Sequence, residues 1–342
     1  MGASQINNSQ GGLSKGALID TDNLVSIRHL AKLLPIHKQK KVLNEMAGVH
    51  TSNLRGRGVD FSEVRSYQAG DDIRAMDWRV TARTQSPHIK VFREERERPV
   101  MAVCDLRASM FFGTQHAFKS VLAADIVSLF SWSALNNGDR IGALLFDDHH
   151  ETDIRPKPGR KQVMHVLHEL SQFTQDQQPA DSVADTQSNT SSASSSRMAD
   201  MLRHTRRVTR PGSTIYFISD WQDFDQDCER QLHQISKHND VVAINIFDAF
   251  EKNILPLGSY PLTDGKQRLQ LECYSKSQGL EHQRAFEQRQ QTLKQRTLKL
   301  GIPLINLQAQ DDIITELRKG LGLGQIAMQK ASASKIEGGK GK

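Results

Sequence analysis

The sequence is short of the features that cross-link, export or anchor a protein. Its 342 residues include only three cysteines, Cys104, Cys228 and Cys273, which lie far apart and without metal-ligand spacing. This distribution argues against a disulfide framework and a zinc ribbon, and it favours a reducing compartment. The N-terminus lacks the apolar segment of a signal peptide. The longest apolar stretch, residues 121–135, contains Asp125 and is shorter than a membrane span. We therefore expect a soluble, cytoplasmic protein.

The chain also has little excess charge outside its C-terminus. Its formal charge is +6, and residues 321–342 carry four lysines against one glutamate, which is +3 of that total. The remaining +3 over 320 residues is too little to predict nucleic-acid binding. The sequence has no GxxxxGK[ST] loop either, which excludes a P-loop ATPase.

Apolar runs and helical periodicity alternate from residue 99 onward. Continuous apolar runs, each typical of a buried parallel strand, occupy residues 100–105, 141–146, 213–219, 241–247 and 302–307. Helical spacing separates them, at residues 115–136, 159–173, 197–207, 225–238, 280–300 and 311–321. Residues 151–155 favour an antiparallel edge strand, and residues 266–273 favour a hairpin. The alternation predicts an α/β fold with a doubly wound, mostly parallel sheet.

Composition divides the chain into four regions. We expect a disordered N-terminus at 1–16, helices and a segment of short strands and turns at 17–98, the sheet domain at 99–322, and a disordered basic tail at 323–342. Two helices are expected in the second region, at 20–34 and 37–46. Residues 175–196 are rich in Gln, Ser, Asp and Thr, which predicts a flexible loop inside the sheet domain.

The segment at 51–98 carries a dense pattern of glycines, aromatics and charges. It reads Gly56-x-Gly58-x-x-Phe61-x-x-Val64-Arg65-x-Tyr67-x-x-Gly70-Asp71-Asp72-x-Arg74-x-x-Asp77-Trp78. Together with Arg83 and the later Gly138-Asp139-Arg140-Ile141-Gly142 and Ile218-Ser219-Asp220, this pattern resembles the domain-of-unknown-function 58 family. The resemblance spans residues 51–307. It implies a von Willebrand factor A-like domain, and a partner role beside MoxR-type AAA+ ATPases in the assembly or maturation of other proteins.

Two of the expected strands end in a carboxylate. Asp105 closes the first strand, and Asp220 follows the strand at 213–219. In doubly wound sheets, ligands bind beyond the carboxyl ends of strands, where the crossover direction changes. In von Willebrand factor A domains, an Asp-x-Ser-x-Ser motif with a later Thr and Asp holds a divalent cation there. The resemblance therefore assigns Asp105, Ser109 and Asp220 to a degenerate Mg²⁺ site, since hard oxygen ligands suit that ion.

Arg107 departs from that motif, because it stands where a serine ligand is expected. A guanidinium is cationic and has no acceptor atom. Pointing inward, it would occupy the place of the cation between Asp105 and Asp220; pointing outward, it would leave one ligand fewer. We expect weak Mg²⁺ binding or none. The alternative is that the two aspartates only cap loops and helix starts. The expected threonine has no clear position, because residues 190–196 offer many hydroxyls.

The charged residues of the segment at 51–98 have two compatible interpretations, an ion-pair network and a partner-binding surface. The candidate partner-binding residues are Arg65, Tyr67, Gly70, Asp71, Asp72, Arg74, Asp77, Trp78 and Arg83, with Arg107 from the sheet domain. We interpret Trp78 as a packing anchor. Asp125, on the apolar stripe of a helix, is expected to accept a hydrogen bond from a neighbouring element.

The leading functional hypothesis is a non-enzymatic protein-interaction module that binds a MoxR-type AAA+ ATPase or its client. One alternative is a metal-dependent hydrolase at the Asp105/Asp220 pocket, which would need a general base that the sequence does not offer. Another is nucleic-acid binding through the ten basic residues at 51–98, against which eight interleaved acids argue.

Overall fold

The protein forms two compact units, residues 1–48 together with 98–342, and residues 49–97. The computed structural model describes residues 13–36, 59–68, 71–94, 99–176, 197–253, 258–263, 268–273 and 276–323. The predicted helix at 37–46 and tail at 323–342 lie almost wholly outside these residues, as does most of the predicted loop at 175–196. Each unit is described by itself.

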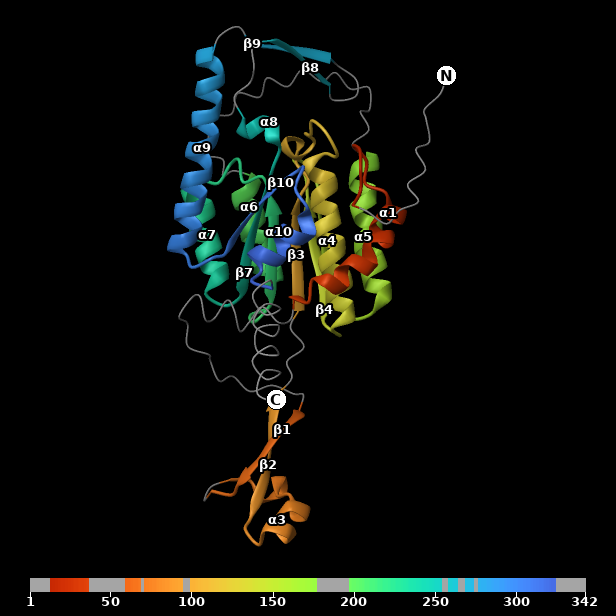
Figure 1. Ribbon diagram of the computed structural model, residues 1–342, viewed down its shortest axis with the longest axis vertical. Helices are drawn as coiled ribbons and strands as arrows, with labels where there is room; N and C mark the ends of the chain where they lie inside the picture. The colour runs from red at the N-terminus through yellow and green to blue at the C-terminus, as the bar shows by residue number, and fades with distance from the viewer. Residues whose placement is uncertain are drawn as a thin grey trace, which may run out of the picture. The chain divides into compact units, whose positions relative to one another are not determined.

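A six-stranded sheet forms the centre of the larger unit (Figure 1). Its strands are β3 (Pro99–Asp105), β4 (Arg140–Phe146), β5 (Glu151–Lys157), β6 (Thr214–Ser219), β7 (Asp240–Phe247) and β10 (Leu304–Gln308). Their order is β10-β7-β6-β3-β4-β5, and every pair is parallel except β4 with β5. The predicted α/β fold with a mostly parallel sheet is confirmed, including the antiparallel edge strand.

Helices cover both faces of this sheet, because the strands are apolar on both sides. Side chains of β3 alternate between two cores: Val100, Ala102 and Cys104 belong to one, and Met101 and Val103 belong to the other. The first core is covered by α1 (Thr21–Ser26), the 3-10 helix η1 (Ile27–Leu33), α4 (Lys119–Asn136), α5 (Arg160–Asp176) and α10 (Ile313–Gly320). The second is covered by α6 (Arg197–Val208), α7 (Gln226–Ser236) and α9 (Lys276–Lys299). None of the helices within the described ranges is both long enough and apolar enough to cross a membrane.

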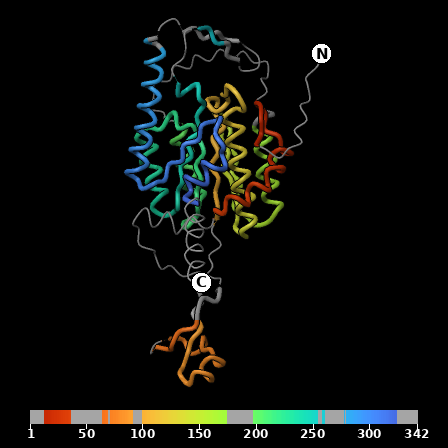
Figure 2. Tube along the Cα trace, in the orientation of Figure 1, coloured from red at the N-terminus to blue at the C-terminus, as the bar shows by residue number. Residues whose placement is uncertain are grey.

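The N-terminal helices pack on the sheet domain. The predicted helix at 20–34 is confirmed as α1 followed by η1, and both lie against α4. Figure 2 shows this red segment beside the yellow and green helices α4 and α5. Ser128 Oγ donates a hydrogen bond of 2.7 Å to the carbonyl of Leu24, which fastens α1 to α4. These helices, predicted in the region at 17–98, belong to the larger unit.

Helix α4 begins four residues later than the predicted start at residue 115. Ala117 instead forms a parallel bridge with Gly16. The Gly16 N–H donates to the carbonyl of His116 at 2.9 Å, and the Phe118 N–H donates to the carbonyl of Gly16 at 3.0 Å. This pairing holds the chain extended up to Phe118, so the helix starts at Lys119.

The smaller unit is built on a two-stranded antiparallel ribbon. Strand β1 (Val59–Ser66) pairs with β2 (His88–Glu94), and the link between them holds the 3-10 turn η3 (Ile73–Ala75) and helix α3 (Trp78–Thr84). The prediction of short strands and turns without a long helix is confirmed for the described residues of this unit.

Four short elements of the described residues complete the larger unit. A second ribbon pairs β8 (Gly258–Thr263) with β9 (Arg268–Cys273), which confirms the predicted hairpin. The 3-10 turn η4 (Ala108–Met110) follows β3, and α8 (Ala249–Lys252) follows β7. Helix α8 was not predicted from the sequence, because four residues are too few to show helical periodicity.

Candidate functional site

The candidate site lies where the sheet changes its crossover direction. Strands β3 and β6 are neighbours, although β4 and β5 lie between them in the sequence. Asp105 is the last residue of β3, and Asp220 directly follows β6. Ser219 Oγ donates a hydrogen bond of 2.6 Å to Asp105 Oδ2, so the two strand ends are tied together. The structure therefore brings Asp105 and Asp220 to one edge of the sheet.

Arg107 points inward at this edge and is buried. Its Nε lies 3.0 Å from Asp105 Oδ1, and its Nη2 lies 2.8 Å from Asp105 Oδ2, which is a two-pronged ion pair. Its Nη1 lies 2.7 Å from Asp223 Oδ2. Of the two orientations considered from the sequence, the structure has the inward one. The guanidinium bridges Asp105 to Asp223 rather than to Asp220.

A second cation, which the sequence analysis did not single out, pairs with Asp220. Lys119 is 0% exposed, and its Nζ lies 3.0 Å from Asp220 Oδ2 and 2.9 Å from Glu251 Oε1. Lysine is almost never fully buried unless it is paired. It is also the first residue of α4, at the positive end of the helix dipole, where a cation is unfavourable. The two carboxylates therefore offset both burial and the dipole.

The loop that holds Glu251 is itself fixed to the site. Asp248 caps α8, and its backbone N–H donates a hydrogen bond of 2.8 Å to Glu251 Oε2. Thr114 Oγ1 donates a hydrogen bond of 2.7 Å to Asp248 Oδ1. The segment between η4 and α4 is thus joined to the end of β7. Gly113 is needed in this segment, since a Cβ there would lie 2.3 Å from the carbonyl oxygen of Ala117.

The backbone between Asp220 and Asp223 adopts an uncommon conformation. Trp221 has φ +55°, in the left-handed region that non-glycine residues seldom occupy. Its backbone N–H donates a hydrogen bond of 3.0 Å to Ser219 Oγ, which helps to hold this conformation. Its indole Nε1 donates to the carbonyl of Ile244 at 3.0 Å, and the buried ring packs on Phe217. These contacts hold the turn that presents Asp220 and Asp223 to the two cations.

Burial and ion pairing act in opposite directions on the Asp105–Arg107 pair. Burial raises the pKa of Asp105, and the hydrogen bonds and charge of Arg107 and the hydroxyl of Ser219 oppose that rise. Burial alone would lower the pKa of Arg107, but the hydrogen bond and charge of Asp105 outweigh it and raise that pKa. The guanidinium of Arg107 therefore stays charged, whereas its burial makes the carboxyl of Asp105 easier to protonate than an ordinary aspartate.

The side chains at this edge do not fit a divalent cation. Both carboxylate oxygens of Asp105 already accept hydrogen bonds from Arg107, and one oxygen of Asp220 accepts from Lys119. Ser109 is half-buried in η4 and makes no hydrogen bond to any described residue. Among the described residues, no group of three or more His, Cys, Asp or Glu side chains has the arrangement of a metal site. The threonine range at 190–196 lies outside those residues.

The outer rim of the site is acidic. The side chain of Asp223 is 60% exposed, although one of its oxygens binds Arg107. Asp148 is also exposed, and its Oδ2 accepts a hydrogen bond of 2.8 Å from the N–H of Ala108. Arg107 and Lys119 are thus buried, whereas the carboxylates of Asp148 and Asp223 are exposed, so the outer surface of the site is negatively charged. We use the name sheet-edge network for Asp105, Arg107, Lys119, Asp220, Asp223 and Glu251.

The predicted residues of the smaller unit are arranged less tightly. Arg65 Nη2 lies 2.7 Å from Asp71 Oδ1, and Lys90 Nζ lies 3.8 Å from Asp77 Oδ2. Asp72 and Asp77 cap η3 and α3 through backbone N–H groups. Tyr67 is half-buried, and its backbone N–H donates to the carbonyl of Pro87 at 2.8 Å. Gly70 lies outside the described residues.

Two expectations for this unit need correction. Trp78 is 68% exposed and so does not pack within the smaller unit, contrary to its interpretation as a packing anchor; Ile89 of β2 is buried in that unit instead. Arg74 and Arg83 are exposed and form no ion pair with a described residue. An ion-pair network that joins Arg65, Asp71, Asp72, Arg74, Asp77 and Arg83 is therefore not present among the described residues. Capping explains the difference, because it uses the aspartates that the network would need.

Asp125 is another fully buried carboxyl, away from the sheet-edge network. Its Oδ2 accepts the N–H of Ser14 at 2.8 Å, and its Oδ1 accepts the Ser14 hydroxyl at 2.7 Å. The expectation that Asp125 accepts a hydrogen bond from a neighbouring element is confirmed. Burial raises its pKa to about 6, since the two neutral donors of Ser14 lower it only in part.

The chain is thus an α/β protein with a mostly parallel sheet. At the switch point of that sheet, where such folds bind ligands, Arg107 and Lys119 pair with the carboxylates. The chain belongs to the family described as protein of unknown function DUF58, whose profile matches residues 63–295. That match covers most of the chain and confirms the resemblance proposed from the sequence.

Mycobacterial proteins align with about two thirds of this chain. Uncharacterized proteins of Mycobacterium tuberculosis and Mycobacterium bovis are 28% identical over 235 residues, which is 69% of this chain and 69% of each relative. Among solved structures, a conserved hypothetical protein BatB from Bacteroides thetaiotaomicron aligns with a TM-score of 0.33 and 11% identity. That alignment covers 59% of this chain and 98% of BatB. An aerotolerance-related membrane protein from Bacteroides fragilis aligns with a TM-score of 0.37 and 12% identity, over 66% of this chain and 98% of that one.

Proposed function

We propose that this protein is a non-enzymatic interaction module that binds a protein partner at the sheet-edge network, without a bound metal ion. The partner we propose is a MoxR-type AAA+ ATPase or its client, in the assembly or maturation of other proteins in the cytoplasm. The larger unit then corresponds to a von Willebrand factor A-like domain in which the cation site has been replaced. The observation that carries the proposal is the pairing of Arg107 and Lys119 with four carboxylates at the switch point of the sheet.

The charge of the network supports this replacement. One guanidinium and one ammonium supply two positive charges, the same total as a divalent cation. They neutralise Asp105 and Asp220, which would otherwise be buried close together and repel each other. Because the cations are covalently part of the chain, the site has one charge state at every metal concentration. The geometry of the loops around Trp221 and α8 then depends on folding and not on binding of a metal ion.

The position of Lys119 supports a functional role rather than a stabilising one. A buried ion pair is weak evidence for stability, since desolvation costs can exceed the attraction between the charges. Lys119 also lies at the unfavourable end of α4. An apolar residue would serve the helix better. We infer that the cation is retained because it orients the acidic rim that the partner contacts.

The two alternative functions fit these contacts less well. A metal-dependent hydrolase needs free oxygens on Asp105 and Asp220, and Arg107 and Lys119 use them. Nucleic-acid binding at the sheet edge would place phosphates against Asp148 and Asp223, both exposed.

The test uses an exposed residue that leaves the ion pairs intact. Gln222 lies between Asp220 and Asp223 with an exposed side chain, so Gln222→Arg places a long cation on the acidic rim. We expect this variant to bind the purified MoxR-type ATPase of the same organism at least tenfold more weakly. Gln234→Arg is the matched control, because Gln234 is an exposed residue of α7 outside the rim, and it should bind like the parent. Equal binding of the two variants would remove the sheet edge as the contact surface. Absence of any complex with the parent chain would remove the ATPase as the partner.

A further inference from the structure

The smaller unit exposes apolar surface that its own fold does not use. Six large hydrophobic side chains are exposed among the described residues, and two of them, Ile73 and Trp78, lie five residues apart in this unit. Ile73 is 61% exposed and Trp78 is 68% exposed. The other two tryptophans of the chain, Trp132 and Trp221, are both buried. The two residues are thus close in the sequence, and clustered exposed apolar residues mark an interaction surface more often than scattered ones do.

Capping fixes the backbone beneath these side chains. Asp77 Oδ1 accepts the N–H groups of Arg79 and Val80, both at 3.1 Å, and this defines the start of α3 at Trp78. The Asp77 N–H donates to the carbonyl of His88 at 2.8 Å, which joins α3 to β2. Trp78 is therefore held on a defined turn while its ring is exposed. A rigid aromatic residue loses little entropy on binding, as recognition residues require.

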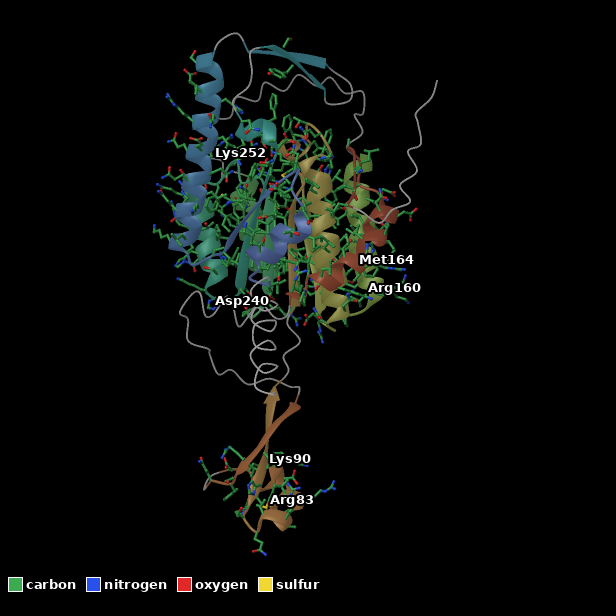
Figure 3. All side chains as sticks on the ribbon, in the orientation of Figure 1. Arg83, Lys90, Arg160, Met164, Asp240 and Lys252 are labelled. Carbon is green, nitrogen blue, oxygen red and sulfur yellow. The ribbon has the colours of Figure 1, made fainter. Side chains whose placement is uncertain are left out.

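The charged side chains near Trp78 in the sequence are positive and exposed to solvent. Arg74, Arg79 and Arg83 are exposed, and none of them forms an ion pair with a described residue. Arg79 and Arg83 are four residues apart in α3 and so lie on one side of the helix. Figure 3 labels Arg83 on this unit, together with Lys90. Asp71, Asp72 and Asp77 are engaged instead in capping and in pairs with Arg65 and Lys90.

A phosphate chain is a poorer match to this surface than a polypeptide. Ile73 cannot stack on a base, although Trp78 can. Asp71 and Asp77 would lie close to bound phosphates in their charged form. The hydrogen bond from Arg65 lowers the pKa of Asp71, and that from the N–H of Val80 lowers the pKa of Asp77. A protein segment can avoid these charges, because it can place separate carboxylates on the arginines and an apolar residue on Trp78.

We propose that Ile73, Arg74, Trp78, Arg79 and Arg83 form a docking surface for an acidic segment of a partner protein that contains an exposed apolar residue. This inference rests on the proposed function and extends it, because it specifies which kind of partner segment binds the smaller unit. Carboxylates of the segment pair with the three guanidinium groups, and its apolar residue covers Trp78 and Ile73. Trp and Arg are the residue types that contribute most at protein interfaces.

The test uses the full chain and a synthetic probe. The probe is a fluorescently labelled twelve-residue peptide of Glu, Leu and Phe, and its controls are the same peptide with Gln for Glu and a labelled single-stranded oligo-dT. We expect binding of the Glu peptide, measured by anisotropy, to weaken at least tenfold in Trp78→Ala and in Arg79→Ala/Arg83→Ala. Leu298→Ala and Arg230→Ala, which change an exposed apolar residue and an exposed arginine of the larger unit, should bind like the parent. Trp78 should also lose its quenching by iodide when the unlabelled peptide is added.

Each contrary result has a definite meaning. Equal peptide binding by the parent and Trp78→Ala would overturn the proposal, because the peptide would bind elsewhere. Oligo-dT binding that depends on Trp78 and exceeds peptide binding would assign the surface to nucleic acid instead. Protection of Trp78 from iodide in the free chain would mean that the chain itself covers this surface, which also overturns the proposal. None of these results depends on Gln222 or on the ATPase, so failure here is distinct from failure of the proposed function.

Discussion

The cations of the two units have opposite surroundings. At the sheet edge, Arg107 and Lys119 are buried, and each is bound by two carboxylates. In the smaller unit, Arg79 and Arg83 are exposed and form no ion pair with a described residue. The first pair is fixed by its partners and cannot rearrange without leaving a buried charge uncompensated. The second pair costs little to leave free and can bind a carboxylate that arrives from outside.

This contrast separates two ways in which charge can serve recognition. The sheet edge uses cations to hold a rigid acidic rim, so a partner meets carboxylates in a set geometry. The smaller unit uses carboxylates to cap its helical turns, so a partner meets arginines and Trp78. A protein with both surfaces can bind partners of opposite charge at separate places, and the variants below test each half of the comparison.

The largest effect is expected from Lys119→Met. Methionine has a similar length but no charge, so Asp220 and the partly buried Glu251 would lose their common partner. Breaking a buried ion pair in this way costs about 3–5 kcal/mol in the free energy of unfolding. Urea denaturation at pH 7 measures the loss. Lys252→Met is the control, because Lys252, labelled in Figure 3, is an exposed lysine of α8. It should change stability by less than about 0.5 kcal/mol. Similar losses in both variants would show that Lys119 is not a paired, buried cation.

Asp125→Asn tests a buried carboxyl that has no cation beside it. The pKa of Asp125 in the folded protein is about 6, above its ordinary value of 3.8. The folded state therefore binds the proton more tightly than the unfolded state does. The resulting stability is fully present below the lower pKa and is lost as the pH rises through about 6. The loss by pH 7 is about 3 kcal/mol at most, since each pKa unit corresponds to about 1.4 kcal/mol.

Asparagine can retain both contacts to Ser14 without this loss. Its carbonyl oxygen accepts the Ser14 N–H, and its amide N–H donates to the Ser14 hydroxyl, which can also accept. We expect the variant to equal the parent near pH 4 and to be more stable by up to about 3 kcal/mol at pH 7. Urea titrations at pH 4, 5.5 and 7 measure the trend. Asp153→Asn, which removes an exposed carboxyl of β5, should differ from the parent by less than about 0.5 kcal/mol at each pH. A constant difference for Asp125→Asn would contradict the raised pKa.

Arg107→Ser tests whether a cation of the chain has taken the place of a metal ion. The parent is expected to bind Mg²⁺ weakly, because a guanidinium about 4 Å from a divalent ion repels it by several kcal/mol at an effective dielectric of about 20. Serine removes this charge and offers a hydroxyl ligand. Mg²⁺ affinity, measured by calorimetry, should rise at least about tenfold, or about 1.4 kcal/mol. Asp105→Ala in the Arg107→Ser background should abolish the gain. Tight Mg²⁺ binding by the parent would contradict the replacement.

The sequence indicates the sheet more completely than the site, for a physical reason. Strands β3, β4 and β6 are buried on both faces, so each is a continuous apolar run that a local pattern detects. Asp105 and Asp220 were also found, since strand order places both at one edge. Lys119, Asp223 and Glu251 were missed because their pairing depends on contacts 101–132 residues apart in the chain. One local signal existed: Lys119 is the only cation in an 18-residue helix that is otherwise nearly uncharged.

The inward direction of Arg107 could not be decided from its own neighbourhood either. Its sequence position fits both orientations, and the choice depends on Asp223, a residue 116 positions away. The exposure of Trp78 could not be predicted from the sequence either. Nothing in the local sequence shows that Trp78 is exposed while Ile89 of β2 is buried, because burial depends on the folded unit.

The smallest effect is expected from Trp78→Ala, compared with Trp221→Ala. Both positions carry a tryptophan in the parent, but Trp221 is buried, packs at a tilt against Phe217 and donates to the carbonyl of Ile244. Truncating it should cost about 3–5 kcal/mol, as for other buried aromatic residues. Trp78 is 68% exposed, so its truncation should change the free energy of unfolding by less than about 0.5 kcal/mol. Urea denaturation followed by circular dichroism compares the two without relying on tryptophan fluorescence. If Trp78→Ala destabilised the chain by more than about 2 kcal/mol, Trp78 would pack within the chain after all, and the smaller unit would have no free aromatic surface to offer an acidic partner.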